Sequence, residues 1–129
     1  QPDDYVIATG RQHSVRDLCT LAFSLAGIEL EWRGTGAEER GVVSKARPVK
    51  DGVVLKPGEP VVMIDPRYFR PSEVDTLLGN PAKAREKLGW EARTPFEDLI
   101  AEMVERDLEE ARRDLLCLRS GFPVVSRHE

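Results

Sequence analysis

The sequence predicts a small mixed α/β domain, in which a few short strands and about three helices follow one another within 129 residues. Residues 28–33 alternate apolar and charged side chains, which is typical of a strand with one face in solvent. Residues 96–118 place apolar side chains at three- and four-residue spacing, which predicts a long amphipathic helix. A chain of this length is one domain of ordinary size, so two large domains are excluded.

The first part of the chain predicts a strand followed by a helix. Residues 5–9 are a short apolar and β-branched run, which is typical of a strand. Ser14 is a suitable helix N-cap, with Asp17 in the first turn. Apolar residues then recur at helical spacing until Gly27, where we expect the helix to end.

The middle of the chain carries weaker patterns. Residues 34–60 mix glycine with charged side chains, so we expect an exposed loop with a short strand at residues 53–55. Residues 61–64 are consecutive apolar side chains between Pro60 and Asp65, which predicts a further strand.

Two helices are predicted in the last part of the chain. Asn80, followed by a proline, indicates a helix start, and Gly89 indicates its end about two turns later. Residues 94–97 have the pattern of a capping box at the start of the long helix. Gly121 is expected to end that helix, and residues 122–129 are expected to form a flexible tail.

The composition excludes several classes of protein. Hydrophobic residues make up 40% of the chain and charged residues 33%, which argues against a disordered, collagen-like or disulfide-rich chain. The net charge of −4 removes the broad attraction that nucleic acids or acidic membranes require. No apolar run approaches the roughly 18 residues of a membrane helix. We therefore expect no nucleic-acid partner and no membrane partner.

The cysteines and the first residues indicate a cytoplasmic protein. Cys19 and Cys117 lie far apart, which fits a reducing compartment better than a disulfide or a metal site. His13 and His128 have no partner at ligand spacing, so no metal site is predicted. Residues 1–4 do not resemble a signal peptide, and the absence of an initial Met fits one portion of a longer protein.

The segment of residues 65–75 crowds arginines, acids and prolines into a loop after a predicted strand, where functional residues are frequent. Arg70 offers a planar fork that can bind two oxygens of a diphosphate. Glu73 offers two acceptor oxygens that suit the paired hydroxyls of a ribose. The alternative is a surface Arg–Glu ion pair of little energetic value, and the residues by themselves favour that alternative.

The chain resembles the C-terminal part of the GDP-mannose 4,6-dehydratases, which belong to the extended short-chain dehydrogenase/reductase superfamily. The resemblance covers nearly everything up to about Leu108, and it rests on residues 2–10, 13–16, 31–34, 65–79 and 87–90. The 65–79 block is the most specific, because it is long and nearly typical of the family. Ser72 replaces an expected Thr and Asn80 an expected Asp, and both preserve the capping or hydrogen-bonding role.

The resemblance implies a C-terminal region, residues 1–121, that holds a GDP-sugar beside an N-terminal Rossmann domain that is absent from this chain. That domain would hold NADP. The implied reaction is a lyase step in nucleotide-sugar metabolism, from GDP-mannose to GDP-4-keto-6-deoxymannose, on the route to sugars such as GDP-fucose. By resemblance, Arg70 binds the diphosphate and Glu73 the ribose, with Arg33 and Arg67 as weaker candidates. A homo-oligomer is implied for the full-length protein.

The superfamily's catalytic Tyr-x-x-x-Lys pair has no counterpart here, since Tyr5 is followed by Thr9 and Tyr68 by Ser72 four positions later. We therefore expect no catalytic residue in this chain and no dehydratase activity from it alone. Two alternatives stay open. One is a portion of a related GDP-sugar epimerase or reductase. The other is a non-catalytic module whose helix at residues 96–118 pairs with a partner helix, although its polar face of mixed charge is typical of a solvated surface.

Overall fold

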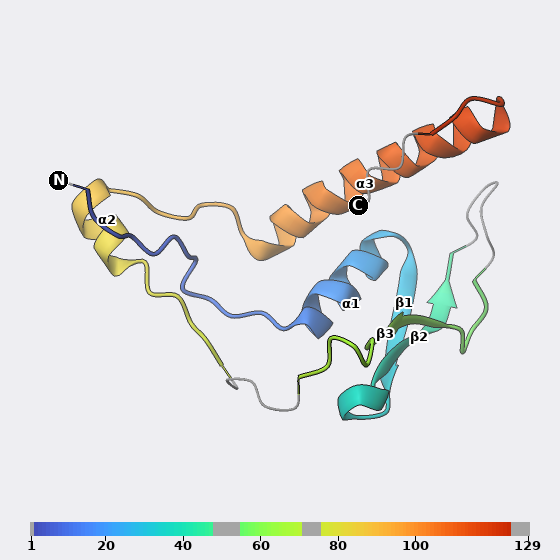
Figure 1. Ribbon diagram of the computed structural model, residues 1–129, viewed down its shortest axis with the longest axis horizontal. Helices are drawn as coiled ribbons and strands as arrows, with labels where there is room; N and C mark the ends of the chain where they lie inside the picture. The colour runs from blue at the N-terminus through green and yellow to red at the C-terminus, as the bar shows by residue number, and fades with distance from the viewer. Residues whose placement is uncertain (1, 48–54, 71–75, 125–129) are drawn as a thin grey trace.

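The computed structural model describes residues 2–47, 55–70 and 76–124, and these ranges form a mixed α/β structure, as predicted (Figure 1). Three α-helices accompany one three-stranded sheet and a short 3-10 helix. In chain order the elements are α1 (Val15–Leu25), β1 (Ile28–Arg33), η1 (Gly36–Glu38), β2 (Arg40–Ala46), β3 (Pro60–Met63), α2 (Ala82–Leu88) and α3 (Phe96–Arg119).

Helix α1 and strand β1 confirm the sequence-based predictions for residues 14–33. The Ser14 hydroxyl accepts a hydrogen bond from the Asp17 backbone N–H at 3.0 Å. The Asp17 carboxylate accepts one in return from the Ser14 backbone N–H at 2.9 Å, which completes a capping box. Gly27 follows the helix with a φ of 83°, a conformation that favours glycine. Along β1, half-buried and exposed residues alternate as the sequence predicts.

The sheet is antiparallel in the order β1-β2-β3. Its central strand holds two buried side chains, Val42 at 3% exposure and Val43 at 1%. Arg33 of β1 is opposite Arg40 of β2, which is in turn opposite Met63 of β3. These three residues therefore mark one end of the sheet, and the chain continues from that end into the 65–70 loop.

Strand β2 corrects the prediction of a loop over residues 34–60. Leu55 lies outside any strand, and residues 53–54 lie outside the described residues. The sequence hides β2 because only Val42 and Val43 in it are large apolar residues, between charged and small ones. Strand β2 pairs with a strand on each side, and local patterning does not report such pairing between residues far apart in the sequence.

The expected strand at residues 5–9 is not formed. This segment instead lies beside the segment that precedes α2, so that a Cβ placed on Gly79 would be 2.6 Å from the Cβ of Ala8. Gly10 similarly lies against Pro81. Across the described part of the chain, no backbone hydrogen bond joins the two segments. Strand propensity without a paired ladder therefore leaves this segment irregular.

Helix α2 begins one residue later than predicted, with Pro81 as its N-cap, while the Asn80 side chain accepts a hydrogen bond from the Ala82 backbone N–H at 3.0 Å. Gly89 ends the helix in the left-handed conformation, as expected. The capping box predicted at residues 94–97 is wrong. Pro95 occupies the N-cap of α3 and makes no side-chain capping bond, which leaves Thr94 one position too early.

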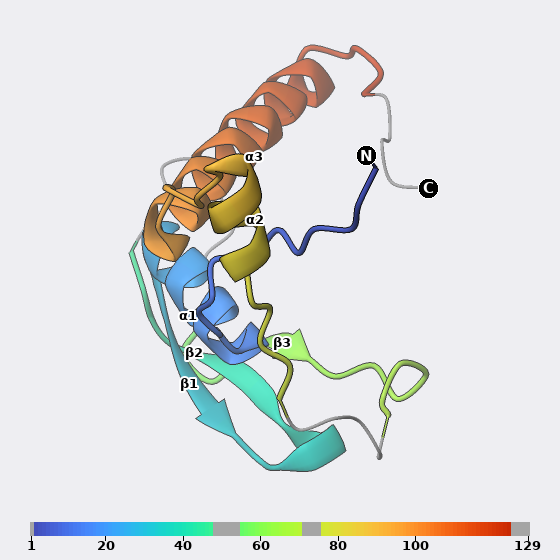
Figure 2. The same cartoon turned by 90° about the vertical axis from the view of Figure 1, so that its left-hand side faces the viewer.

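Helix α1 contacts both β1 and α3, and so joins the sheet to the long helix (Figure 1, Figure 2). Ile100, in the first turns of α3, is buried, and the His13 ring stacks on Phe96 with centroids 3.9 Å apart. Leu116 and Leu118, near the other end of α3, are 65% and 61% exposed. The long helix thus packs through its first half and extends into solvent through its second.

Candidate functional site

The loop after β3 holds two of the predicted site residues, Arg67 and Arg70. A turn begins the loop, in which the Tyr68 backbone N–H donates to the Asp65 carbonyl oxygen at 3.0 Å. The Arg67 backbone N–H also donates to the Asp65 carboxylate, at 2.9 Å. These two bonds fix the loop on Asp65 and leave Arg67 and Arg70 exposed.

The Arg67 guanidinium is bound to Asp65. Its Nε lies 3.1 and 3.0 Å from the two carboxylate oxygens, and its Nη2 lies 2.5 Å from Oδ2. The side-chain hydrogen bond from Arg67, aided by its backbone N–H, holds the pKa of Asp65 below its usual value. The same hydrogen bond raises the pKa of Arg67. Since the Arg67 side chain is 79% exposed, this pair contributes little stability, but it does occupy the fork that a phosphate would need.

Arg33 lies at the same end of the sheet as this loop, because it belongs to the row that ends at Met63. Its Nη2 lies 2.9 Å from Oε2 of Glu31. This hydrogen bond lowers the pKa of Glu31 and raises the pKa of Arg33. The fold therefore places Arg33 at the same end of the sheet as the 65–70 loop, but gives it an acidic partner of its own.

One arrangement recurs at this end of the sheet: an arginine pairs with the acid two positions before it. Arg33 and Arg67 follow this arrangement, and so does Arg40, whose Nη2 lies 3.2 Å from Oε2 of Glu38. An anionic ligand must compete with a carboxylate for each of these three cations. Both weaker candidates are thus less available than the sequence suggests.

The two main candidates differ in what the structure says of them. Arg70 is exposed, outside helices and strands, and two residues beyond the turn that ends at Tyr68. Glu73 lies outside the described residues, as do the other positions of 71–75. The joint use of Arg70 and Glu73 for one ligand therefore stays a prediction.

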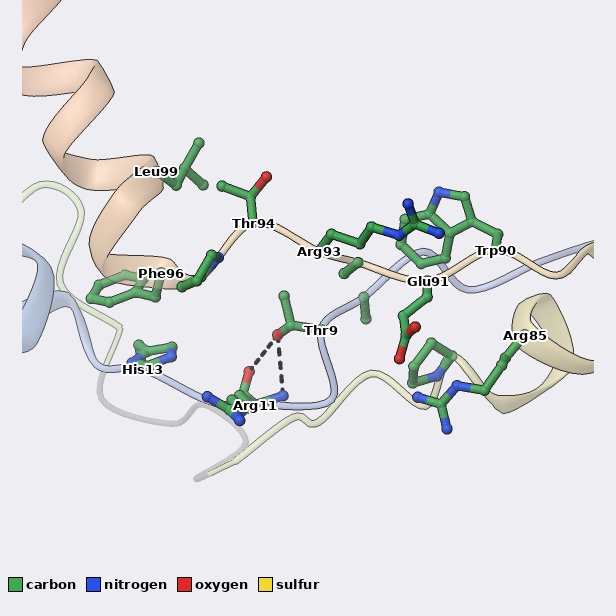
Figure 3. Close-up of a pocket in the computed structure, with 14 residues that line it drawn as sticks. Thr9, Arg11, His13, Arg85, Trp90, Glu91, Arg93, Thr94, Phe96 and Leu99 are labelled. Atoms are coloured by element: carbon green, nitrogen blue, oxygen red, sulfur yellow. Dashed lines mark hydrogen bonds between the residues drawn. The ribbon is translucent and has the colours of Figure 1, made fainter.

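A pocket of about 420 Å³ lies elsewhere in the structure (Figure 3). It is bordered by the N-terminal segment (residues 2–13), by α2 and by the linker that leads into α3 (residues 90–95). Arg11, Arg85 and Arg93 line it, whereas Arg33, Arg67 and Arg70 do not. No sequence motif indicates this pocket. Its three arginines come from three separate segments and share no motif, so only the packing of those segments brings them to one cavity.

The described ranges 2–47, 55–70 and 76–124 offer no cluster of metal ligands and no membrane-spanning helix. Within them, no group of three or more His, Cys, Asp or Glu side chains could hold a metal ion. None of the helices in these ranges has the length and apolar character required to cross a membrane.

Comparison with known proteins identifies the chain's relatives. The model of the family described as GDP-mannose 4,6 dehydratase matches residues 1–103. The GDP-mannose 4,6-dehydratase of Yersinia enterocolitica is 46% identical over 124 residues, which cover 96% of this chain and 33% of that protein. A Vibrio cholerae protein of the same name matches with the same identity and coverage. The GDP-mannose 4,6 dehydratase 2 of Caenorhabditis elegans is 50% identical over 83% of this chain and 25% of its own length.

The chain thus spans about a third of the length of the bacterial relatives it matches. The matched region includes the whole of the 65–70 loop and the residues that line the pocket. With similarity of this degree over most of its length, the chain belongs to the GDP-mannose 4,6-dehydratase family.

Proposed function

We propose that this chain is the nucleotide-sugar-binding part of a GDP-mannose 4,6-dehydratase, a lyase that converts GDP-mannose to GDP-4-keto-6-deoxymannose. One observation carries the proposal: relatives that bear this name match 96% of the chain at 46% identity. The exposed loop with Arg70 at the end of the sheet supports it, because an arginine fork there can reach a diphosphate from solvent.

The proposal assigns the hydride carrier, NADP, to a part of the enzyme beyond these residues. A dinucleotide site needs a glycine-rich turn that opens a helix toward a pyrophosphate. The described helices instead have Ser14, Pro81 and Pro95 as N-caps, and none of these residues belongs to such a turn. The described residues do not offer such a site for NADP, and we place no catalytic step on them.

The residues of this chain bind and orient the substrate in this proposal. Arg70 holds the diphosphate of GDP-mannose, and Glu73 accepts hydrogen bonds from the ribose hydroxyls. Arg33 and Arg67 contribute less, because each is already bound to a carboxylate. Residues 1–121 form the binding region and residues 122–129 lie beyond it. The proposed setting is a cytoplasmic homo-oligomer in which this region packs on its own Rossmann domain.

Isothermal titration of the complete encoded polypeptide with GDP tests the role of Arg70. Arg70→Ala removes a charge-assisted contact worth about 1.5–3 kcal/mol. The affinity for GDP should therefore decrease by a factor of roughly ten to more than a hundred. Arg112→Ala removes the same charge from the exposed surface of α3 and should leave GDP affinity unchanged. Parent-like binding of GDP by Arg70→Ala would remove Arg70 from the site.

The role of Glu73 has a separate test with the same method. Glu73→Gln removes the negative charge and one hydrogen-bond acceptor, so it should lower the affinity for GDP. It should barely change the affinity for 2′,3′-dideoxy-GDP, which lacks the hydroxyls that Glu73 would bind. Equal losses for both ligands would contradict the ribose assignment. Product analysis with GDP-mannose then separates a dehydratase from a GDP-sugar epimerase or reductase, since only the dehydratase forms the 4-keto-6-deoxy sugar.

A further inference from the structure

Three arginines from different segments line the pocket shown in Figure 3. Arg11 lies in the N-terminal segment, Arg85 lies on α2, and Arg93 lies in the linker before α3. Their positions far apart in the sequence mean that the fold, and no local charge run, brings these cations to one cavity. Like charges that share a cavity repel one another, so this arrangement calls for an electrostatic reason.

The guanidinium groups of these three arginines are without acidic partners among the residues that the structure describes. The hydrogen bonds that they make within this part of the chain use their own backbone atoms, as when the Arg11 backbone N–H donates to the Thr9 hydroxyl. At the end of the sheet, by contrast, Arg33 and Arg67 are each paired with a carboxylate. Donors that are unused within the chain are available to a ligand.

The balance of charge in the pocket favours an anion. Three arginines face a single lining carboxylate, Glu91, although the chain as a whole has a net charge of −4. Helix α3 also starts at the pocket, but Glu97 and Asp98 in its first turn already offset its dipole. The arginines are therefore the cations that would attract an anion to the pocket.

The size of the pocket and its aromatic wall narrow the choice of ligand. A volume of about 420 Å³ lies in the usual range of roughly 300–1,000 Å³ for small-molecule sites. That is more room than a lone phosphate needs. Trp90 also lines the pocket and adds a flat apolar surface (Figure 3). Arginine forks recognise phosphate oxygens in pairs, so a phosphate group is the anion that this donor set suits best.

We propose that this pocket is a second binding site, separate from the one at Arg70, which takes a phosphate-bearing small molecule the size of a nucleotide or a sugar phosphate. Arg11, Arg85 and Arg93 bind the phosphate oxygens, and Trp90 contacts the rest of the ligand. The site does not depend on the proposed use of Arg70, because Arg70 does not line it.

Trp90 provides a local readout of this site. The complete encoded polypeptide, labelled with 5-fluorotryptophan, is titrated with inorganic pyrophosphate and followed by ¹⁹F NMR, with Trp90→Phe assigning the resonance. A saturable shift of the Trp90 signal is expected at about 50 mM salt, where screening is moderate. Sodium chloride at matched ionic strength should not reproduce that shift. An identical response to sodium chloride would overturn the proposal.

Variants identify the groups that bind. Arg85→Ala and Arg93→Ala should each lower the affinity for pyrophosphate about tenfold, because each removes a charge-assisted contact from an exposed site. Arg112→Ala, a matched loss of an exposed arginine outside the pocket, should change nothing. Glu91→Gln should instead tighten binding, since it removes the one lining carboxylate. Parent-like affinity in the two arginine variants, or weaker binding in Glu91→Gln, contradicts an anion site.

Two further arms test the separateness of the site and the source of the phosphate. Arg70→Ala should leave the Trp90 response to pyrophosphate intact, and loss of that response would show a single shared site. GDP and glucose 1-phosphate are then compared with pyrophosphate. Tighter binding of GDP identifies a nucleotide ligand, and tighter binding of glucose 1-phosphate identifies a sugar phosphate. Weaker binding of both than of pyrophosphate overturns the proposed ligand size.

Discussion

Asp17 owes its electrostatic state to its place in the capping box. The Ser14 backbone N–H, followed by the Ser14 hydroxyl, lowers the pKa of Asp17 through hydrogen bonds. A carboxyl group whose pKa is lower in the folded state stabilises the fold above its unfolded value, here 3.8. That contribution is lost as the pH falls through the folded pKa.

We therefore expect Asp17→Asn to lower the melting temperature at pH 7, and the difference from the parent to shrink as the pH falls below 3.8. Asp107→Asn is the control, because Asp107 makes no side-chain hydrogen bond or ion pair within the described part of α3. Thermal unfolding followed by circular dichroism between pH 7 and pH 2.5 measures both variants. If the difference in melting temperature between Asp17→Asn and the parent is as large at pH 2.5 as at pH 7, the charge of Asp17 is not its cause.

At the scale of elements, the contact between the N-terminal segment and the segment before α2 rests on the absence of a side chain at Gly79. A Cβ there would lie 2.6 Å from the Cβ of Ala8 and 3.4 Å from Cγ1 of Val6. The first distance is too short for two carbon atoms, so the two segments would have to move apart. Both segments border the arginine pocket, through Ala8 and Pro81.

Gly79→Ala should therefore destabilise the protein by about 1–3 kcal/mol, as overpacking does in well-packed sites. The swap Ala8→Gly with Gly79→Ala removes the opposing methyl group and should recover a large part of that loss. Urea unfolding of the parent, both single variants and the double variant forms a double-mutant cycle. Additive effects, without recovery in the swap, would mean that the two residues are not in contact.

At the scale of the whole molecule, this chain exposes more surface than a compact protein of its size. Its accessible surface is 11108 Å² at a mass of 14.5 kDa, whereas a compact monomer of that mass exposes roughly 6,900 Å². Large apolar side chains are open along the two adjoining segments, including Val6, Ile7, Leu77 and Leu78. Exposed apolar surface of this extent is typical of a face that another part of a protein covers.

The 129-residue chain by itself should accordingly convert no GDP-mannose in the presence of NADP, whereas the complete polypeptide should form the 4-keto-6-deoxy product. The reason is that the proposed enzyme keeps its cofactor site and catalytic residues outside this chain. Chromatography of the nucleotide sugars measures both reactions, with boiled protein as the baseline. Product above that baseline from the 129 residues alone would contradict the proposed division of roles.

The sequence alone determined the features that neighbouring residues control. Ser14 and Asp17 form their predicted cap, and Gly27 and Gly89 end their helices, because each needs only the residues within one or two turns. The alternation along β1 was predictable for the same reason. The family-specific block at residues 65–79 pointed to Arg70, and the chain's membership of that family is now established.

Tertiary structure decided what depends on residues far apart in the chain. Val42 and Val43 are buried in a strand that pairs with distant strands on both sides, while residues 5–9 form no backbone ladder with another described segment and stay irregular. The gathering of three arginines in one pocket is equally invisible in any local stretch. Periodicity and capping report short-range energetics, whereas strand pairing and the convergence of charges arise only when distant segments pack together.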